Sequence, residues 1–427
     1  MIGWKKIKIA DLSNTKNSFV QTGPFGSQLH ESDYSVEGIP VIMPKDIVQG
    51  VISDFSIARV SENHASRLNR HKVQCGDIVY GRRGNIGRHA LIRIKEEGWL
   101  CGTGCLLLRL DKLKIYPLFS HYYLSQKTII DHITNQAVGS TMPNLNTEII
   151  KNVTVFLPPL LLQRKIAAIL SAYDDLIENN NRRIVILEKM AEELYREWFV
   201  RLRFPGYERV KIVKGVPEGW AVMKAFEVLD ILGGGTPKTD VPSNWDGNIP
   251  FFTPKDSHDG YFAYATEKNI SELGLQSCNS QYFPKKTIFI TARGTVGNVV
   301  MALRPMAMNQ SCYALIPKSN NFKLFHFLAL RDSIAVIKGT ANSGVFDNII
   351  TDSFKQFGYL IPPDGLILHF EQIAQNILHE MEILFLKSRL ASTSRDRLLS
   401  RLMSGKIDVE NLDIQFPRSM KEEMANA

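Results

Sequence analysis

The sequence has no long apolar run. Over its 427 residues no window approaches the ~18 uninterrupted apolar residues that a membrane-spanning helix needs. The first residues read MIGWKKIKIADL, and Lys5, Lys6 and Lys8 interrupt the stretch where a secretion signal would need an apolar core. We therefore expect a protein that neither spans a membrane nor carries a signal peptide.

Cysteine is scarce and shows no regular spacing. The five cysteines are odd in number and contain no C-x-x-C pair. The histidines are scattered and do not combine with the cysteines at metal-ligand spacing. This pattern favours reduced thiols in a cytoplasm, and it argues against a zinc site or a disulfide framework.

Signatures of catalysis are missing as well. There is no G-x-x-x-x-G-K-[ST] loop for nucleotide phosphates, and no G-x-G-x-x-G opens a helix after a strand. The two Pro-Pro pairs, FLPPL and LIPPD, lack the Asn or Asp before proline and the aromatic residue after it that amino-methyltransferases use to hold a target base. We expect a chain without enzymatic activity of its own. A methyltransferase or nuclease activity is the weaker alternative, which a methylation assay of the purified chain would test.

The chain contains an internal repeat. Residues 39–46, IPVIMPKD, return as IPFFTPKD at residues 249–256, an offset of 210 (249 − 39). The stretches DIVYGRRGNIG (residues 77–87) and TIFITARGTVG (residues 287–297) keep the same offset. Further landmarks follow in the same order with a small drift: a Gly-Trp pair near the start of each half, the Pro-Pro pair, and KIAAIL against QIAQNI. This indicates a tandem duplication with loop-sized insertions.

Size and charge agree with a large globular protein that could bind nucleic acid. The length suits two to four domains, and 44% hydrophobic with 22% charged residues is ordinary for a folded protein. The net charge is +8, from 51 basic and 43 acidic residues. That excess raises the expectation of a nucleic-acid partner without establishing one.

Each half changes from short β-like runs to a strongly helical pattern after its Pro-Pro pair. Apolar residues recur at alternating spacings of four and three over residues 166–198 and again over residues 370–402, where Ser388 and Arg395 interrupt them. Such spacing is typical of a coiled-coil seam. Two helices of about 35 to 40 residues, each on the order of 55 Å long, are expected to pair antiparallel with each other.

Alternatives remain for these helices. Each could instead pack only onto its own globular domain. Asn180, the lone polar residue of the first seam, could fix the register against the other helix or could simply be solvated.

The combination of motifs resembles the specificity subunits of type I restriction-modification systems. The resemblance covers nearly the whole chain and depends on TGPFGSQL (residues 22–29) with GGGTPKT (residues 233–239), on the PKD and RG phrases of each half, and on LPPLLLQRKIAAIL with LLSRLMSGKIDV. Leu162 departs from the family pattern, which usually has Glu there, and DGLILHF after the second Pro-Pro pair is longer than usual. These departures concern the start and the register of the helices, not the resemblance itself.

The resemblance implies an α+β fold with an internal pseudo-two-fold duplication, in which two similar target recognition domains are separated by two long antiparallel coiled-coil helices. The expected boundaries are recognition domains at residues 1–157 and 205–363, helices at residues 158–204 and 364–405, and a C-terminal tail at residues 406–427.

The resemblance also implies a function. Each recognition domain would read one half of a bipartite double-stranded DNA target, while the helices set the spacing and dock two modification subunits that methylate adenine. S-adenosylmethionine, ATP and Mg would be bound by those subunits and by associated restriction subunits that translocate and cut DNA, with no cofactor in this chain. A coiled-coil protein-binding adaptor without DNA specificity is the alternative, and salt-dependent binding to duplex DNA would separate the two.

Two kinds of residue are candidates for contact with DNA. In the motifs that the two halves share, the glycines are expected to allow turns with positive φ. Lys45 and Lys255 are expected to support the fold rather than to contact bases, and the arginines could do either. The residues that recognise the DNA sequence are expected to lie in the segments where the two halves differ. The candidate DNA-binding residues are Gln28, His30, Lys45, Arg82, Arg83, Asn85, Arg88, Ser140, Thr141, Asn144, Asn146, Lys238, Thr239, Asn244, Lys255, Arg293, Asn342 and Ser343.

Apolar residues clustered near the helix ends are the candidates for binding the modification subunits. They are Trp198, Phe199, Leu398 and Leu402. A single partner helix would not be expected to hide all of them.

Overall fold

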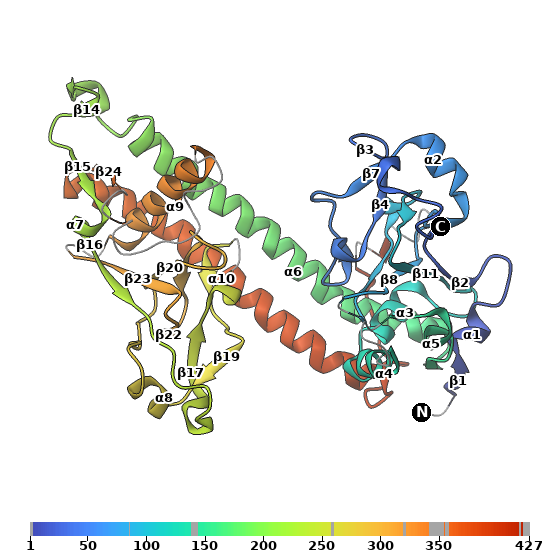
Figure 1. Ribbon diagram of the computed structural model, residues 1–427. Helices are drawn as coiled ribbons and strands as arrows, with labels where there is room; N and C mark the ends of the chain where they lie inside the picture. The colour runs from blue at the N-terminus through green and yellow to red at the C-terminus, as the bar shows by residue number, and fades with distance from the viewer. Residues whose placement is uncertain are drawn as a thin grey trace. The chain divides into compact units, whose positions relative to one another are not determined.

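The computed structural model describes residues 3–84, 86–137, 144–257, 260–318, 322–340, 354, 358–417 and 420–421 (Figure 1). Contacts divide the chain into two compact units: unit 1 comprises residues 1–179 with 388–427, and unit 2 comprises residues 180–387. The division falls inside two long helices, α6 (Leu160–Tyr195) and α10 (Asp364–Met403). Each unit therefore contains one globular part and a segment of both helices, and the domain boundaries expected from the sequence stay a prediction. No helix of the described ranges is both long and apolar enough to cross a membrane.

Unit 1 has two four-stranded sheets in its described part, with strand orders β2-β11-β8-β9 and β10-β4-β7-β3. A ribbon of β1 and β12 ties the start of the chain to the residues that precede α6, and β5 pairs with β6. The strands are β1 (Lys5–Lys8), β2 (Phe19–Thr22), β3 (Tyr34–Ser35), β4 (Ile39–Ile42), β5 (Ile47–Val48), β6 (Val51–Ile52), β7 (Ala58–Val60), β8 (Ile78–Gly81), β9 (His89–Leu91), β10 (Leu100–Cys101), β11 (Cys105–Arg109) and β12 (Thr154–Leu157). The shorter helices are α1 (Ile9–Leu12), α2 (Glu62–Arg67), α3 (Pro117–Leu124), α4 (Lys127–Ala137) and α5 (Thr147–Lys151).

In its described residues unit 2 repeats this architecture with a five-stranded sheet, β16-β23-β20-β21-β18, and a three-stranded sheet, β19-β17-β22. Two ribbons, β15-β24 and β13-β14, accompany them. The strands are β13 (Ile212–Val213), β14 (Val216–Pro217), β15 (Ala221–Lys224), β16 (Leu229–Gly233), β17 (Trp245–Phe252), β18 (Phe262–Ala263), β19 (Lys268–Ile270), β20 (Ile288–Thr291), β21 (Val299–Ala302), β22 (Ala307–Met308), β23 (Cys312–Pro317) and β24 (Gly358–Ile361). The shorter helices are α7 (Ala225–Val228), α8 (Glu272–Gln276) and α9 (Lys323–Thr340).

The duplication is visible in the register of strand pairing. Strand β4 pairs with β7 so that Ile39 faces Val60, and β17 pairs with β19 so that Ile249 faces Ile270. Ile249 and Ile270 each lie 210 positions after their counterparts Ile39 and Val60, which is the offset between the two PKD phrases in the sequence. In the same way the β11-β8 pairing returns in β23-β20. The predicted α+β fold with an internal duplication is confirmed.

The helices α6 and α10 each begin directly after a Pro-Pro pair. Helix α6 follows the first Pro-Pro pair, and a wide π-helical turn (Arg196–Val200) extends it toward Pro205. Helix α10 follows the second Pro-Pro pair and ends near Gly405, whose φ of 64° is typical of a residue that terminates a helix. They contain 36 and 40 residues, respectively, as the seams suggest.

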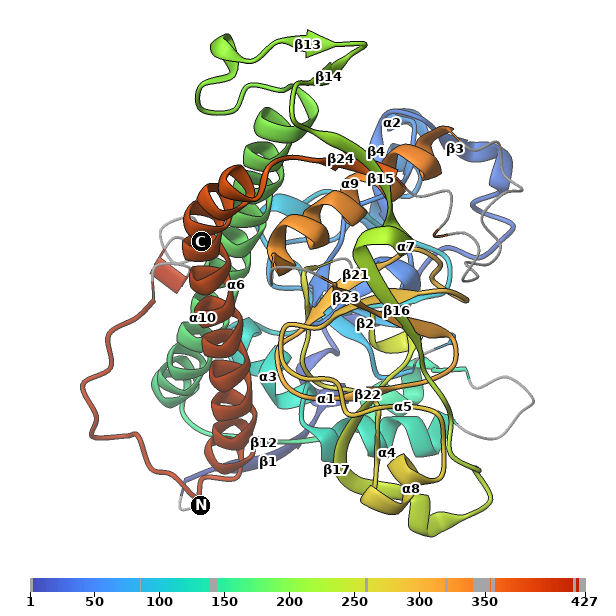
Figure 2. The ribbon, with the colours of Figure 1, turned by 90° about the vertical axis from the view of Figure 1, so that its left-hand side faces the viewer.

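The two helices run antiparallel within each unit, as predicted, and lie side by side in Figure 1 and Figure 2. In unit 1 an ion pair joins Asp174 on α6 to Arg395 on α10. In unit 2 Arg183 on α6 bonds to Glu380 on α10 at 2.7 Å. Arg395 interrupts the apolar seam, but its guanidinium gains a specific partner on the facing helix.

Asn180 is buried, with 2% of its surface exposed, so the alternative of a solvated Asn is wrong. Its Nδ2 has no hydrogen-bond partner among the described residues. A role of Asn180 in fixing the register of the helices stays a prediction.

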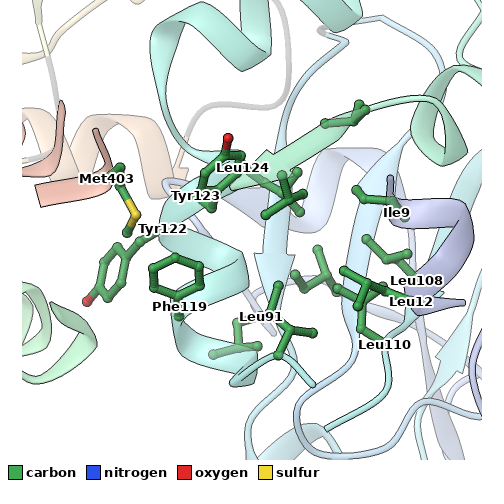
Figure 3. Packing of buried hydrophobic residues seen from close by; sticks show 14 of the residues in the cluster. Ile9, Leu12, Leu91, Leu108, Leu110, Phe119, Tyr122, Tyr123, Leu124 and Met403 are labelled. Atoms are coloured by element: carbon green, nitrogen blue, oxygen red, sulfur yellow. The ribbon is translucent and has the colours of Figure 1, made fainter. Parts of the chain in front are cut away.

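Each unit has its own apolar core. In unit 1, α3 contributes Phe119, Tyr122 and Tyr123, which pack with Leu108 from β11 and with Met403 from the end of α10 (Figure 3). Burial of side chains of this size is worth roughly 1.5 to 3 kcal/mol each. The C-terminal end of α10 is therefore part of the core of the first globular domain.

Candidate nucleic-acid interface

The PKD phrase forms the same turn in both units. It folds into a short 3₁₀ turn, Pro44–Asp46 in unit 1 and Pro254–Asp256 in unit 2. In unit 1 the Asp46 Oδ2 accepts a hydrogen bond from the backbone N–H of Met43 at 2.8 Å, and in unit 2 Asp256 accepts one from Thr253 at 2.8 Å. Both carboxylates are buried, and burial raises the pKa of Asp46. The proline and aspartate thus hold the turn.

Lys45 and Lys255, between that proline and aspartate, are exposed. The Lys45 Nζ reaches only a backbone carbonyl, that of Ser56, at 3.4 Å. The Lys255 Nζ lies 3.9 Å from the Glu267 Oε2, and the two side chains are 81% and 59% exposed. An ion pair that open to water contributes little, so neither lysine is fixed by a strong interaction.

The RG phrase forms a second shared turn, which follows β8 in unit 1 and β20 in unit 2. Gly84 and Gly294 have φ of 76° and 79°, a left-handed conformation that favours glycine. The prediction that these glycines allow a turn is confirmed. Arg83 and Arg293, which precede them, are both exposed. In the described part of the chain neither arginine makes a hydrogen bond or an ion pair.

The PKD turn packs against the RG turn in unit 2, and in unit 1 it packs against the end of β8, which leads into the RG turn. A Cβ added to Gly81, at the end of β8, would lie 3.5 Å from the Cβ of Pro44, and one added to Gly294 would lie 3.4 Å from the Cβ of Pro254. In unit 2 the Thr295 hydroxyl also donates to the Pro254 carbonyl at 3.2 Å. Each unit therefore presents one exposed lysine and one exposed arginine from adjoining turns.

Arg82 has a different position from Arg83. It is half-buried, and its Nε donates to the carbonyl of Leu145 at 3.0 Å. The backbone N–H of Leu145 returns a bond of 3.0 Å to the Arg82 carbonyl. Arg82 thus ties the segment at residues 144–146 to the RG turn and is already engaged inside the protein.

The remaining candidates divide into three groups. Arg88, Asn144, Lys238, Thr239 and His30 are exposed. Three others hold local structure: Gln28 accepts from the Phe25 N–H, Asn146 caps α5 through the Ile149 N–H, and the buried Asn244 donates to the Lys238 carbonyl. Asn85, Ser140, Thr141, Asn342 and Ser343 lie outside the described residues.

A hollow next to Lys238 and Thr239 contains residues that the sequence reasoning missed. Thr239, Trp245, Asp246 and Lys268 line a volume of about 240 Å³. The Lys268 Nζ lies 5.4 Å from the centre of the Trp245 ring, and the indole N–H donates to the Lys238 carbonyl at 3.0 Å. The tryptophan in SNWDGN, directly after the candidate Asn244, was the signal that could have drawn attention to this site.

The candidate partner-binding residues are less exposed than expected. Trp198, Phe199 and Leu402 are only 7%, 3% and 1% exposed, and Leu398 is half-buried. Phe199 lies 5.0 Å from both Phe325 and Phe370, between ring centres, so the core of unit 2 encloses it. The prediction that these residues form an exposed apolar surface is wrong, because the globular domains cover the helix ends.

Other apolar side chains of the helices are exposed. They are Leu161, Leu176, Val185, Ile186 and Met190 on α6, and Leu368, Ile373, Leu386 and Leu390 on α10. They lie outside the seam that joins the two helices.

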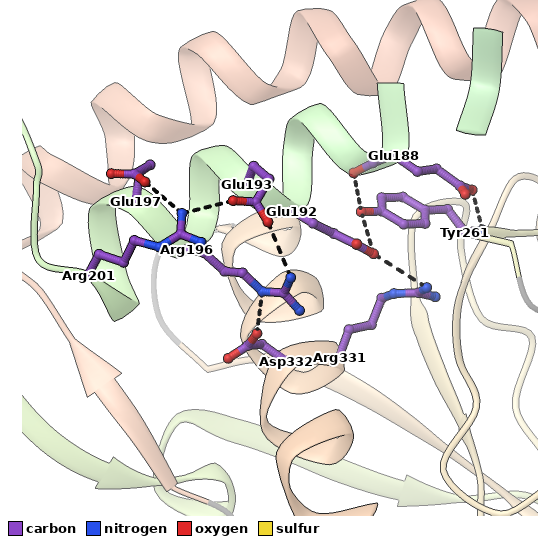
Figure 4. Close-up of polar contacts among 9 residues, drawn as sticks. All are labelled: Glu188, Glu192, Glu193, Arg196, Glu197, Arg201, Tyr261, Arg331 and Asp332. Atoms are coloured by element: carbon purple, nitrogen blue, oxygen red, sulfur yellow. Dashed lines mark hydrogen bonds and ion pairs between the residues drawn. The ribbon is translucent and has the colours of Figure 1, made fainter. Parts of the chain in front are cut away.

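A polar network attaches the globular part of unit 2 to α6 (Figure 4). The Tyr261 N–H donates to the Glu188 carboxylate at 3.1 Å, and Arg196 bonds to Asp332 of α9 at 2.9 Å. In unit 1 the hydroxyl of Tyr122 donates to Asp174, which also holds Arg395. In each unit these contacts fix the globular part on its helices.

In the described part of the chain no group of three or more His, Cys, Asp or Glu side chains could hold a metal ion. The arrangement offers basic and amide side chains on turns, which suits contact with a polyanion.

Comparison with known proteins identifies the family. The family model of the type I restriction modification DNA specificity domain matches residues 1–189 and 217–379. The type I restriction enzyme MjaIX specificity subunit of Methanocaldococcus jannaschii is 26% identical over 406 residues, covering 88% of each chain. The HindI specificity subunit of Haemophilus influenzae is 22% identical over 401 residues, covering 78% of this chain and 87% of that protein.

A solved structure has the same fold. The crystal structure of the type I restriction-modification system S subunit from M. genitalium matches with a TM-score of 0.55 and 20% identity, covering 94% of this chain and 96% of that one. The family model matches most of the chain, with one segment in each half. The chain therefore belongs to the family of type I restriction-modification DNA specificity subunits.

Proposed function

We propose that this chain is the DNA-recognition subunit of a type I restriction-modification complex, in which each half reads one half of a bipartite target. The observation that carries the proposal is a duplicated frame with unlike loops. Both halves share strand register and the PKD and RG turns. The loops around those turns differ, with the exposed His30 in one half and the exposed Lys238 and Thr239 in the other. Bases are told apart by such polar side chains at groove edges.

An exchange of one half tests this proposal. Residues 1–157 end with β12, which pairs with β1, so replacing this segment by that of a relative moves the sheets of the first domain together and keeps both long helices. Mapping methylated adenines in cells that also express the modification subunit should show one half-site changed and the other retained. The reciprocal exchange of residues 219–363 should change the other half-site. An exchange that alters both half-sites would contradict independent reading.

We further propose that the helices dock two modification subunits, which supply the chemistry with S-adenosylmethionine, while ATP and Mg serve associated restriction subunits. The complex would act in the cytoplasm. The exposed apolar residues of α6 support this docking, because side chains such as Ile186 and Met190, 57% and 51% exposed, have no partner in the seam.

Charged substitutions test the docking surface. Ile186→Lys with Met190→Lys should abolish copurification of the modification subunit and leave thermal unfolding of the isolated chain unchanged, because both side chains are exposed. Lys189→Gln, between them on α6, is the matched control and should copurify normally. Retention of two modification subunits by the double variant would contradict docking at this face.

The helices would also set the gap between the half-sites. Inserting four residues after Asn179, matched by four after Lys387, should move the domains by about 6 Å, because an α-helix rises ~1.5 Å per residue. Since DNA rises ~3.4 Å per base pair, the gap should lengthen by about one or two base pairs, with both half-sites unchanged. The matched insertion is needed because α6 and α10 are paired in both units.

The insertion has a phase control. Two residues would rotate the helical faces by about 200° and should damage folding, whereas four residues keep the seam nearly in phase. An unchanged gap with normal methylation in the four-residue variant would mean that the helices do not set the spacing.

A further inference from the structure

The two shared turns contain side chains that folding does not explain. In the PKD turn, the proline shapes the backbone and the buried aspartate caps it. In the RG turn, Gly84 and Gly294 supply the positive φ. Nothing in either turn requires a lysine or an arginine, yet both units have the pair, Lys45 with Arg83 and Lys255 with Arg293.

Neighbouring basic residues were not retained in both halves. Arg82 is matched by Ala292, and Arg88 is matched by Asn298. Arg82 also has an internal task, since it bonds to the Leu145 carbonyl. The lysine-arginine pair is thus the basic feature that the two halves share on these turns.

An exposed feature shared by two domains that read different sequences suits contact with something that both half-sites have in common. Every DNA half-site has the sugar-phosphate backbone, which lysine and arginine contact without regard to sequence. We propose that Lys45 with Arg83, and Lys255 with Arg293, are matching phosphate clamps that position each domain on the duplex, while the unlike loops beside them read the bases. This inference rests on the proposed function.

The surroundings of the four side chains suit this task. All four are exposed. In unit 2 the two turns pack through Pro254 and Gly294, and in unit 1 Pro44 packs against Gly81, which precedes Arg83 by two residues. Among the residues that the structure describes, the one carboxylate within 4 Å of these side chains is Glu267 beside Lys255, and it is itself 59% exposed. A phosphate could therefore bind without breaking a buried ion pair.

The test compares charge-neutral variants of the complex with modification subunits. The probe is a duplex that carries the methylation target mapped in cells, beside a duplex of scrambled sequence. We expect Lys45→Gln with Arg83→Gln, and Lys255→Gln with Arg293→Gln, each to weaken binding of both duplexes by a similar factor, on the order of tenfold. The slope of log affinity against log salt should fall by about one for each phosphate that the variant no longer neutralises.

Two controls make the result specific. Lys211→Gln with Lys214→Gln, exposed in the β13-β14 hairpin, removes the same charge elsewhere and should leave the slope unchanged. Lys45→Arg with Arg83→Lys keeps both charges and should retain most of the binding. Thermal unfolding of each variant should match that of the unsubstituted chain, because the substituted side chains are exposed.

The outcomes separate the two proposals. If the unsubstituted complex does not distinguish target from scrambled DNA, the proposed function fails. If it does distinguish them, an unchanged salt slope in the Gln variants overturns the clamps. A variant that loses preference at one half-site, with scrambled DNA bound as before, would make these residues base readers and would also overturn the clamps.

Discussion

The first half of the chain has a buried ion pair where the second half has none. Asp77, 1% exposed, makes two bonds to Arg109 at 2.8 and 2.7 Å. Strand register places Thr287 and Ile316 at the matching positions of unit 2. The Thr287 hydroxyl donates to the Pro284 carbonyl, and Asp77 accepts from the Gln74 N–H, so both residues close the same turn.

This difference shows which features the duplicated frame requires. The strand register and the closed turn are common to both halves, whereas the charge at this position is not. An ion pair can be replaced by a hydroxyl and an apolar side chain when both partners change together, because the cost of a buried charge arises when its partner is missing.

The largest effect should come from breaking the pair on one side. Asp77→Ala leaves Arg109, whose side chain is only 14% exposed, without its counter-ion and should cost about 3 to 5 kcal/mol of unfolding free energy. Thr287→Ala removes only a neutral hydrogen bond and should cost about 1 kcal/mol. Urea unfolding followed by circular dichroism measures both.

Introducing the unit 2 residues at the matching positions of unit 1 tests this explanation of the difference. Asp77→Thr with Arg109→Ile should recover most of the stability that Asp77→Ala loses, because no unpaired charge remains. Equal destabilisation by the single and double variants would show that the pair has a role in unit 1 beyond mutual neutralisation.

The halves also differ in buried histidines. In unit 1, His89 and His121 lie 5.0 Å apart between ring centres, and burial lowers the pKa of both. Val299 and Phe327 occupy the matching positions of unit 2. Because burial disfavours the charged form, each histidine takes up a proton at a lower pH in the folded state than in the unfolded state. Its stabilising contribution is therefore present above pH ~6.5 and is lost as the pH falls below that value.

Removing the two histidines should reduce acid sensitivity. The unsubstituted chain should lose up to about 1.4 kcal/mol per pH unit for each such histidine below pH ~6.5. His89→Val with His121→Phe should lose about 2 to 3 kcal/mol less than the unsubstituted chain between pH 6.5 and pH 5, as measured by urea unfolding. An equal loss in both proteins would assign the acid sensitivity to other groups.

Much of the frame could be predicted from the sequence because it depends on local or repeated signals. The Pro-Pro pairs, the alternating seams and the offset between phrases predicted two long antiparallel helices and a duplication. The positive φ of Gly84 and Gly294 also follows from a local signal, a glycine in a tight turn.

The candidate sites were less predictable because they depend on contacts between distant residues. Arg82 is engaged by Leu145, 63 positions away, and nothing in GRRGNIGR distinguishes it from Arg83. Phe199 is buried by Phe325, which belongs to the globular part of unit 2. Asn146 is an exception, since an Asn followed by TEII is a recognisable helix cap.

A smaller effect is expected at a turn that both halves make with a left-handed residue. Gly76 has φ of 88°, and a Cβ added there would lie 3.0 Å from the side chains of Lys112 and Pro117. Gly76→Ala should therefore destabilise the chain by about 1 to 2 kcal/mol, from backbone strain together with crowding. Thermal unfolding would measure this change, and an unaffected midpoint would mean that the turn relaxes.

The smallest effect is expected at the matching position of unit 2, where Lys286 has φ of 67°. The Lys286 N–H donates to Ala302 at 2.7 Å, as the Gly76 N–H donates to Ile92 at 2.8 Å, so the two turns are equivalent. Lys286→Gly relieves the left-handed strain but also removes a charge near the buried Glu371. Lys286→Ala removes the same charge and keeps the Cβ, so the Gly variant should be more stable than the Ala variant by about 1 kcal/mol. Equal stability of the two variants in urea unfolding would show that the left-handed residue in this turn is not strained, and that the halves differ here in sequence alone.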